Sequence, residues 1–294
     1  MGLIHPAGPS FAHWSDNFGG LAAAQTSDSY GTFVTPGTSN ADGSTVTLMP
    51  ALAHDCEYLI LGFNGFGEPA KSMRCIADIL VDPAGGTSWS NLISGLLVGQ
   101  TEYGLFLKSG SFTDSAAFVL YHFPLWIPAG ASLGVRAKTS DAAGFTSSTR
   151  VWAVAAGGNK HPASWWCGQK VETLGSVRAS STGTAVANGV SASFGSWVNV
   201  GSASSARGGA LQFMARGTTG TSLNNQYNVY EFGIAGTAIG PRHYGGQSTS
   251  TTIHNSLFSG PVFLDTPSGT QFQARGMSSH SGGNALDCCV YVVQ

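Results

Sequence analysis

Residues 127–137 read IPAGASLGVRA, and residues 266–276 read TPSGTQFQARG. The two stretches align without a gap, at the offset in residue number that separates Arg136 from Arg275. In each, a proline followed two positions later by glycine favours a tight turn, and the alternating apolar residues after it favour a strand. A strand-borne arginine at the same place in both copies is best explained by a structural hydrogen bond or a carboxylate pair. The repeated positions are Pro128, Gly130 and Arg136, and then Pro267, Gly269 and Arg275.

The same offset continues downstream, where it pairs Val151 with Val290 and Trp152 with Tyr291. Upstream the likeness is weaker and the offset is slightly larger, as between residues 58–65 and 210–217. A match of this extent indicates a repeated domain rather than a repeated hairpin.

Short apolar segments separated by glycine-rich and proline-rich turns fill both copies, which is typical of a β-sandwich or barrel. We therefore predict an all-β chain with two tandem antiparallel β-sandwich domains of jelly-roll-like form. The predicted division is an N-terminal arm over residues 1–25, a first sandwich over 26–157 and a second over 158–294.

The N-terminal arm carries aromatic residues among prolines and glycines and has neither a helical nor a strand period. Such residues need a groove in which to bury. The arm either reaches over a neighbouring subunit or packs back on its own domain, and the sequence leaves both alternatives open. The candidate assembly residues are Phe11, His13, Trp14 and Phe18.

Charge is scarce, because only 10% of the residues are charged against about 25% in most soluble domains. A net charge of −2 without basic clusters argues against nucleic-acid binding. Few charges suit a surface that is buried against partners, so we expect a homo-oligomer.

No apolar run approaches the roughly 20 residues of a membrane helix, and the first residues lack the pattern of a signal peptide. We expect synthesis in the host cytoplasm, without membrane association.

The chemistry-bearing residues form no recognisable motif. The five cysteines are odd in number and lack CxxC spacing, and the eight histidines are dispersed, so we expect no disulfide framework, metal or cofactor. The cluster His54-Asp55-Cys56 is a poor nucleophile pair because neighbours on a strand point to opposite faces. Asp78, Asp82 and Glu231 lie in or beside predicted strands without forming an acid/base motif. We expect no catalytic site.

Two alternatives remain. A carbohydrate-binding module for a host glycan would use Trp165 and Trp166, or Tyr244, as stacking platforms, although the tryptophan pair also suits an interdomain wedge. A polysaccharide-degrading enzyme would have to draw its acid/base pair from Asp78, Asp82 and Glu231.

Residues 123–130, which read FPLWIPAG and are followed by Leu133 and Arg136, resemble a pattern in uncharacterised virion proteins of tailed bacteriophages. The resemblance implies a jelly-roll-like sandwich carried on the particle, as a tail, fibre or capsid-decoration protein. Its partners would be other virion proteins and copies of itself. The leading hypothesis is therefore a non-enzymatic structural component of a virion.

Overall fold

The computed structural model is all-β in the part of the chain that it describes, with no helix there and hence no helix that could cross a membrane. The described residues are 11–14, 31–64, 75–99, 119–139, 142, 150–157, 167–175, 183–204, 209–217, 226–247, 257–258, 262–264, 266–279 and 285–294.

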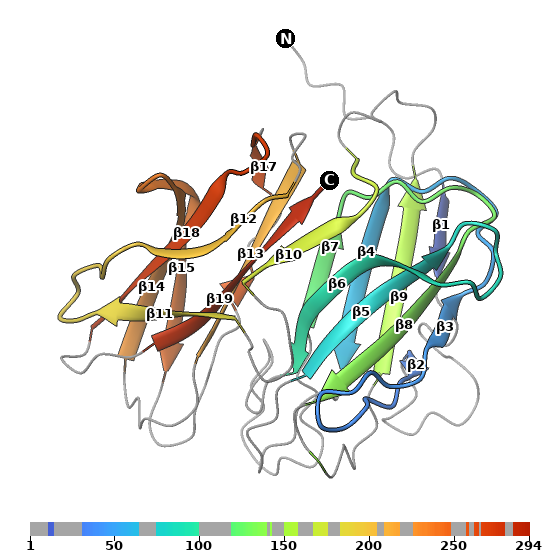
Figure 1. Ribbon diagram of the computed structural model, residues 1–294, viewed down its shortest axis with the longest axis horizontal. Helices are drawn as coiled ribbons and strands as arrows, with labels where there is room; N and C mark the ends of the chain where they lie inside the picture. Colours follow the sequence, from blue (N-terminus) through green and yellow to red (C-terminus); the bar gives the residue numbers. More distant parts are fainter. Residues whose placement is uncertain are drawn as a thin grey trace.

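The strands fall into two groups, which we call the first half (β1 to β9) and the second half (β10 to β19) (Figure 1). The first half contains β1 (Phe11–Trp14), β2 (Thr32–Phe33), β3 (Val46–Met49), β4 (Tyr58–Asn64), β5 (Cys75–Asp82), β6 (Ser90–Gly99), β7 (Val119–Phe123), β8 (Ser132–Thr139) and β9 (Arg150–Gly157). The second half contains β10 (Val171–Leu174), β11 (Thr184–Gly189), β12 (Val198–Ser202), β13 (Gly209–Gly217), β14 (Gln226–Ile234), β15 (Thr237–Gln247), β16 (Leu257–Phe258), β17 (Val262–Leu264), β18 (Gln271–Ser278) and β19 (Ala285–Val293).

The first half is a sandwich of two sheets. One sheet has the order β2–β9–β4–β7, with β1 also on β9, and the other has the order β3–β8–β5–β6. Successive strands from β2 to β9 thus alternate between the sheets except at β5 and β6, which are neighbours in one sheet, and this is the strand order of an eight-stranded jelly roll. Inward-facing residues such as Leu61, Phe63 and Val135 are fully buried between the sheets.

The second half has the same strand order. Its sheets are β11–β19–β13–β17 and β12–β18–β14–β15, so β18 corresponds to β8 and β19 to β9. These are the strands that the offset from Arg136 to Arg275 relates in the sequence. A separate core, which includes Phe232 and Phe272, fills the space between the sheets.

The proline turns before β8 and β18 have matching geometry. Gly130 and Gly269 have φ values of 85° and 82°, a region that glycine enters without steric cost. The N–H of Gly130 donates to the carbonyl of Leu52 at 2.7 Å, and the N–H of Gly269 donates to the carbonyl of Ala203 at 2.8 Å. Each turn thereby fixes the start of the strand that carries the repeated arginine.

A second pair of matching loops precedes β3 and β12. Residues 37–46 read GTSNADGSTV and residues 189–198 read GVSASFGSWV, so the glycines and the final valine coincide. Each loop contains two consecutive non-glycine residues with positive φ. A backbone hydrogen bond ties the first loop to the end of β8 and the second loop to the end of β18. The positive φ values are at Ser39, Asn40, Ser191 and Ala192, and the anchoring bonds run from Asn40 N–H to Thr139 O (2.8 Å) and from Ala192 N–H to Ser278 O (2.9 Å).

Strand β19 is shared between the cores of the two halves. Cys289, Tyr291 and Val293 belong to the first core, whereas the alternate residues, such as Val290, belong to the second. Side chains on a strand alternate between its faces, so both faces of β19 are buried. This explains why residues 288–293 read CCVYVV without a charged residue.

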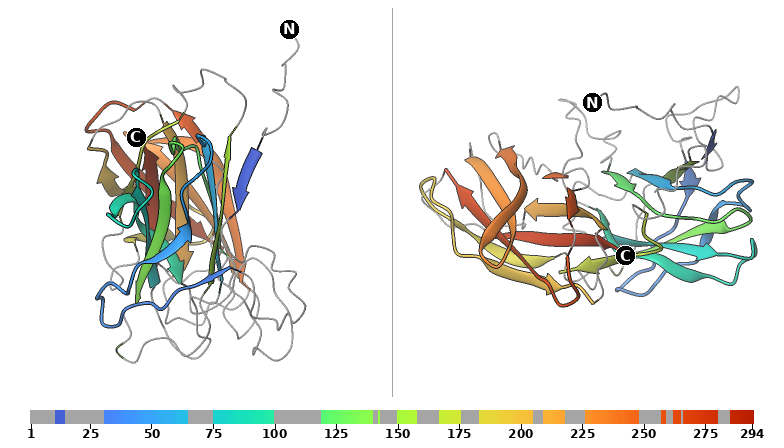
Figure 2. Two further views of the ribbon diagram at one scale, coloured as in Figure 1. Left: turned by 90° about the vertical axis from the view of Figure 1, so that its right-hand side faces the viewer. Right: turned by 90° about the horizontal axis from the view of Figure 1, so that it is seen from above.

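Strand β10 completes the connection, which we call the seam. It pairs antiparallel with β19 and parallel with β6 through Val171 and Ile93, so the sheets of the two halves are continuous. Seen from above, β19 and β10 reach from the second half to the strands of the first, and the C-terminus lies between the halves (Figure 2). Residues 158–166, which follow β9 in the sequence, are outside the described part of the chain.

The N-terminal aromatic segment pairs with its own chain. Phe11–Trp14 forms β1, which runs antiparallel to β9 with Phe11 opposite Gly157 and Trp14 opposite Val154. These four residues of the predicted arm therefore pair with their own half. Phe18 lies outside the described residues.

Candidate functional site

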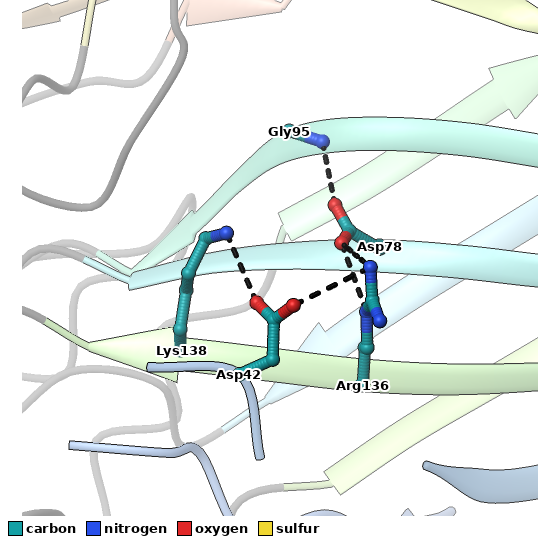
Figure 3. A network of polar contacts seen from close by, with 5 residues as sticks. All are labelled: Asp42, Asp78, Gly95, Arg136 and Lys138. Carbon is teal, nitrogen blue, oxygen red and sulfur yellow. Dashed lines mark hydrogen bonds and ion pairs between the residues drawn. The ribbon is translucent and has the colours of Figure 1, made fainter. Parts of the chain in front are cut away.

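A network of charged side chains lies on the outer face of the first half (Figure 3). Arg136 on β8 and Asp78 on β5 are register partners, so their side chains meet across the two strands. The Nε of Arg136 donates to Asp78 Oδ2 at 3.1 Å. Asp42, from the loop before β3, accepts Lys138 Nζ at 3.0 Å and lies 3.4 Å from Arg136 Nη2. The N–H of Gly95 on β6 donates to the second Asp78 oxygen at 2.9 Å.

The second half has a related network at the matching place. Arg275 on β18 and Glu231 on β14 are register partners, with Arg275 Nε 2.8 Å from Glu231 Oε2. Arg242 on β15 donates to the other oxygen of Glu231 at 2.6 Å. Phe194 occupies the position that corresponds to Asp42, and its ring centroid lies 4.5 Å from the Arg275 guanidinium carbon. Trp197 lies 4.4 Å away, so Arg275 has two aromatic partners instead of a second carboxylate.

The pKa of Glu231 is lowered in the folded protein. Burial alone raises this pKa, but the hydrogen bonds and positive charges of Arg275 and Arg242 outweigh burial. A carboxylate whose pKa is lower in the folded state stabilises the protein above its unfolded pKa of about 4.3, and this contribution is lost as the pH falls through the folded pKa.

We therefore expect the free energy of unfolding to decrease as the pH falls below about 4, partly through Glu231. The Glu231→Gln variant cannot titrate at this position, so its free energy of unfolding should depend less on pH in the same range. Denaturant unfolding at pH 7, 5, 4 and 3 measures both proteins. Parallel pH profiles for the two proteins would contradict this role of Glu231.

A groove of about 590 Å³ lies on the outer face of the seam, and we call it the seam groove. Strands β5, β6 and β8 of the first half and β10 of the second half form it. Its lining residues are polar apart from Gly95, Ile76 and Val171. The charged members are Asp78, Arg136, Lys138, Lys170 and Glu172, and the uncharged polar members are Asn91, Ser94, Thr173, Ser204 and Gln294.

Hydrogen bonds fasten β10 along this groove. The Thr173 hydroxyl donates to the carbonyl of Ser94 on β6, and the Gln294 amide donates to the carboxylate of Glu172. The N–H of Ser204 donates to the same carboxylate oxygen at 2.9 Å. The wall that the second half contributes to the groove is therefore held in place by bonds on both sides of β10.

Two buried tyrosines hold the seam from the core side. The hydroxyl of Tyr121 on β7 donates to the carbonyl of Leu97 at 2.7 Å, and the N–H of Leu97 donates to the hydroxyl of Tyr291 at 3.1 Å. The two rings meet edge to face at 5.5 Å. Burial raises the pKa of both tyrosines well above the ordinary value, so both remain neutral. A tyrosine from each half thus contacts the same residue of β6.

The three acids that the sequence offers for catalysis are engaged in separate structural contacts. Asp78 pairs with Arg136, and Glu231 pairs with Arg275. Asp82 accepts the N–H groups of Ala84 at 2.9 Å and Ser88 at 2.7 Å, which fixes the turn between β5 and β6. The three carboxylates belong to three different networks.

All five cysteines are free thiols, and four of them are buried. Burial, together with Asp55, raises the pKa of Cys56 to about 12, and burial, together with Glu57, raises the pKa of Cys167 to about 11. The Cys56 thiol donates to the backbone carbonyl of His54 at 3.5 Å. No group of three or more cysteine, histidine or acidic side chains within the described ranges is placed to hold a metal ion.

Of the three aromatic residues considered for sugar binding, only Tyr244 lies in the described part of the chain. Trp165 and Trp166 lie outside the described residues. Tyr244 lies on β15, opposite Val229 of β14.

Sequence reasoning missed the groove residues Lys170, Glu172 and Asn91, which belong to no motif. It also missed Asp42 and Phe194. An alignment of residues 37–46 with residues 189–198 would have identified Asp42 and Phe194 as a pair, because each directly precedes the second glycine of its loop.

Comparison with known proteins gives no family assignment, because no family model and no curated protein matches the chain. Among solved structures, the major capsid protein P2 of bacteriophage PM2 is similar with a TM-score of 0.34 and 10% identity, over 89% of this chain and 97% of that one. The tandem CBM22 domains of Paenibacillus barcinonensis Xyn10C have a TM-score of 0.24 and 12% identity, over 88% and 85%. The infectious bursal disease virus VP2 subviral particle has a TM-score of 0.28 and 11% identity, over 97% and 72%. At these TM-scores none of the three identifies the function of this chain.

Proposed function

We propose that this chain is a non-enzymatic structural component of a bacteriophage virion, which acts by packing against copies of itself and against other virion proteins. The observation that carries the proposal is the seam. Strand β19 contributes alternate residues to two cores, and β10 joins the sheets, so two jelly rolls are fixed side by side. A subunit that must repeat in a particle needs such a fixed shape, because its contact surfaces have to keep one relative orientation.

The scarcity of charge supports the same proposal. With 10% charged residues and a net charge of −2, the surface has little of the charge that keeps free monomers apart. The charged side chains of the two outer networks are also paired within the chain, as Arg136 is with Asp78 and Arg275 with Glu231. Surfaces of this kind are suited to burial in contacts between subunits.

A non-enzymatic role fits the use that the fold makes of its acids. General acid/base hydrolysis of a glycosidic bond requires two carboxyl groups that flank one bond. Asp78, Asp82 and Glu231 instead hold a cross-strand arginine, a turn and an arginine pair. The proposal therefore places this protein among structural components rather than among polysaccharide-degrading enzymes.

Light scattering of the purified protein tests the proposal. We expect multimers of defined mass at concentrations near those of an assembling particle. Their share should rise at high salt, because salt screens the remaining charge repulsion and strengthens apolar contacts. Mass spectrometry of purified particles should find the protein in a fixed copy number, in the tens for a tail location and in the hundreds for a head. A monodisperse monomer of 30.2 kDa that binds no virion protein would overturn the proposal.

A further inference from the structure

We propose that the seam groove binds an uncharged saccharide unit of a glycan. This inference goes beyond the proposed role in the particle and does not depend on it. The groove volume of about 590 Å³ falls within the roughly 300 to 1,000 Å³ typical of small-ligand sites. Its walls come from both halves, so the site exists only because β10 pairs with β6.

The charges of the groove nearly cancel, because three cations and two carboxylates line it and Asp42, which lies outside the lining, pairs with two of the cations. Arg136 and Lys138 face Asp78 and Asp42, and Lys170 lies two residues before Glu172 of β10. A site for a polyanion needs an excess of cations, as phosphate recognition shows. The balance here favours a ligand that carries no net charge.

The polar groups of the groove include both donors and acceptors. The carboxylates of Asp78 and Glu172 accept hydrogen bonds, while arginine and lysine only donate. A sugar hydroxyl both donates and accepts, so neighbouring hydroxyls on one ring can match such a mixed row. A ligand with donors alone or acceptors alone would leave half of these groups unmatched, which costs free energy on binding.

Two exposed side chains of the groove are available for hydrogen bonds to a ligand. Asn91 lies on β6 and Lys170 directly precedes β10, on the opposite wall, and both are exposed. Neither side chain forms a hydrogen bond or ion pair with the described residues. Ile76 and Val171 add apolar surface that suits the C–H face of a pyranose ring.

The described lining of the groove contains no aromatic ring, so the stacking that strengthens many sugar sites is missing there. We therefore expect weak binding of one unit and stronger binding of a glycan presented in many copies. Assembly into a multimer would supply that gain by multivalency.

Protein-observed NMR titration of the full chain tests the proposal. The probes are neutral oligosaccharides of glucose, galactose, mannose and N-acetylglucosamine, with sialyllactose and heparin fragments as charged comparisons. We expect a neutral probe to shift the amide signals of residues 91–95 and 170–173. The double variant Lys170→Ala/Asn91→Ala should weaken this binding at least 10-fold.

Thr87→Ala is the matched control, because Thr87 is exposed on the turn between β5 and β6 but does not line the groove. It should bind like the unaltered protein. Light scattering of all three proteins should give the same oligomeric state, which separates saccharide binding from assembly. The proposal is overturned if no neutral probe shifts groove signals, if the double variant binds as well as Thr87→Ala, or if only the charged probes bind.

Discussion

Replacing Tyr291 by alanine is expected to lower the free energy of unfolding by about 3 to 5 kcal/mol and to divide unfolding into two transitions. The ring is fully buried and reaches from the second half into the first core. It packs edge to face against Tyr121 at 5.5 Å and Phe123 at 6.1 Å. Its loss leaves a cavity at the seam, where the two halves depend on each other. Guanidinium unfolding and calorimetry measure both effects.

The Tyr291→Phe variant separates the ring from the hydroxyl. It keeps the packing but removes the acceptor for the Leu97 N–H, a buried donor. Leaving such a donor unpaired costs about 1 to 3 kcal/mol, and unfolding should remain a single transition. If Tyr291→Ala unfolds in one transition with a loss no larger than that of Tyr291→Phe, the ring does not hold the halves together.

Replacing Arg275 by alanine is expected to lower the free energy of unfolding by about 3 to 5 kcal/mol. The Glu231 side chain is only 4% exposed and would keep just one cation, that of Arg242. Phe194 and Trp197 would also lose the guanidinium against which their rings lie. Equilibrium denaturation at pH 7 measures the loss.

Two further variants make this test specific. Arg242→Ala removes a side chain that is 56% exposed, and because solvent screens that contact we expect a loss of only about 1 kcal/mol. The double variant Glu231→Gln/Arg275→Ala should recover part of the loss, since a neutral amide is less costly to bury than an unpaired carboxylate. Equal losses in Arg275→Ala and Arg242→Ala would refute the claim that Arg275 neutralises the buried acid.

The fold class was predictable because its signals are local. Short alternating strands and proline–glycine turns identify a sandwich, and the offset from Arg136 to Arg275 identified β8 and β9 as the counterparts of β18 and β19. The partner of each repeated arginine was not predictable in the same way. Asp78 precedes Arg136 by 58 residues, whereas Glu231 precedes Arg275 by 44, so a fixed spacing misses the correspondence.

The seam illustrates a different limit of sequence reasoning. An uninterrupted apolar run at residues 288–293 indicates a strand buried on both faces. Periodicity does not reveal what covers the second face, because the covering residues, such as Tyr121 and Leu97, lie far away in the chain. The seam groove shares this property, since Asn91 and Lys170 line one groove only when β10 pairs with β6.

The central claim is that β19 and β10 join the two halves into one body. Native-state hydrogen exchange tests it most directly. We predict that the amides of Leu97 on β6 and of residues 288–293 on β19 exchange only through global unfolding, with the same protection free energy in both halves. The account would be contradicted if the second half opened separately, so that the Leu97 amide exchanged while β5 and β8 remained protected.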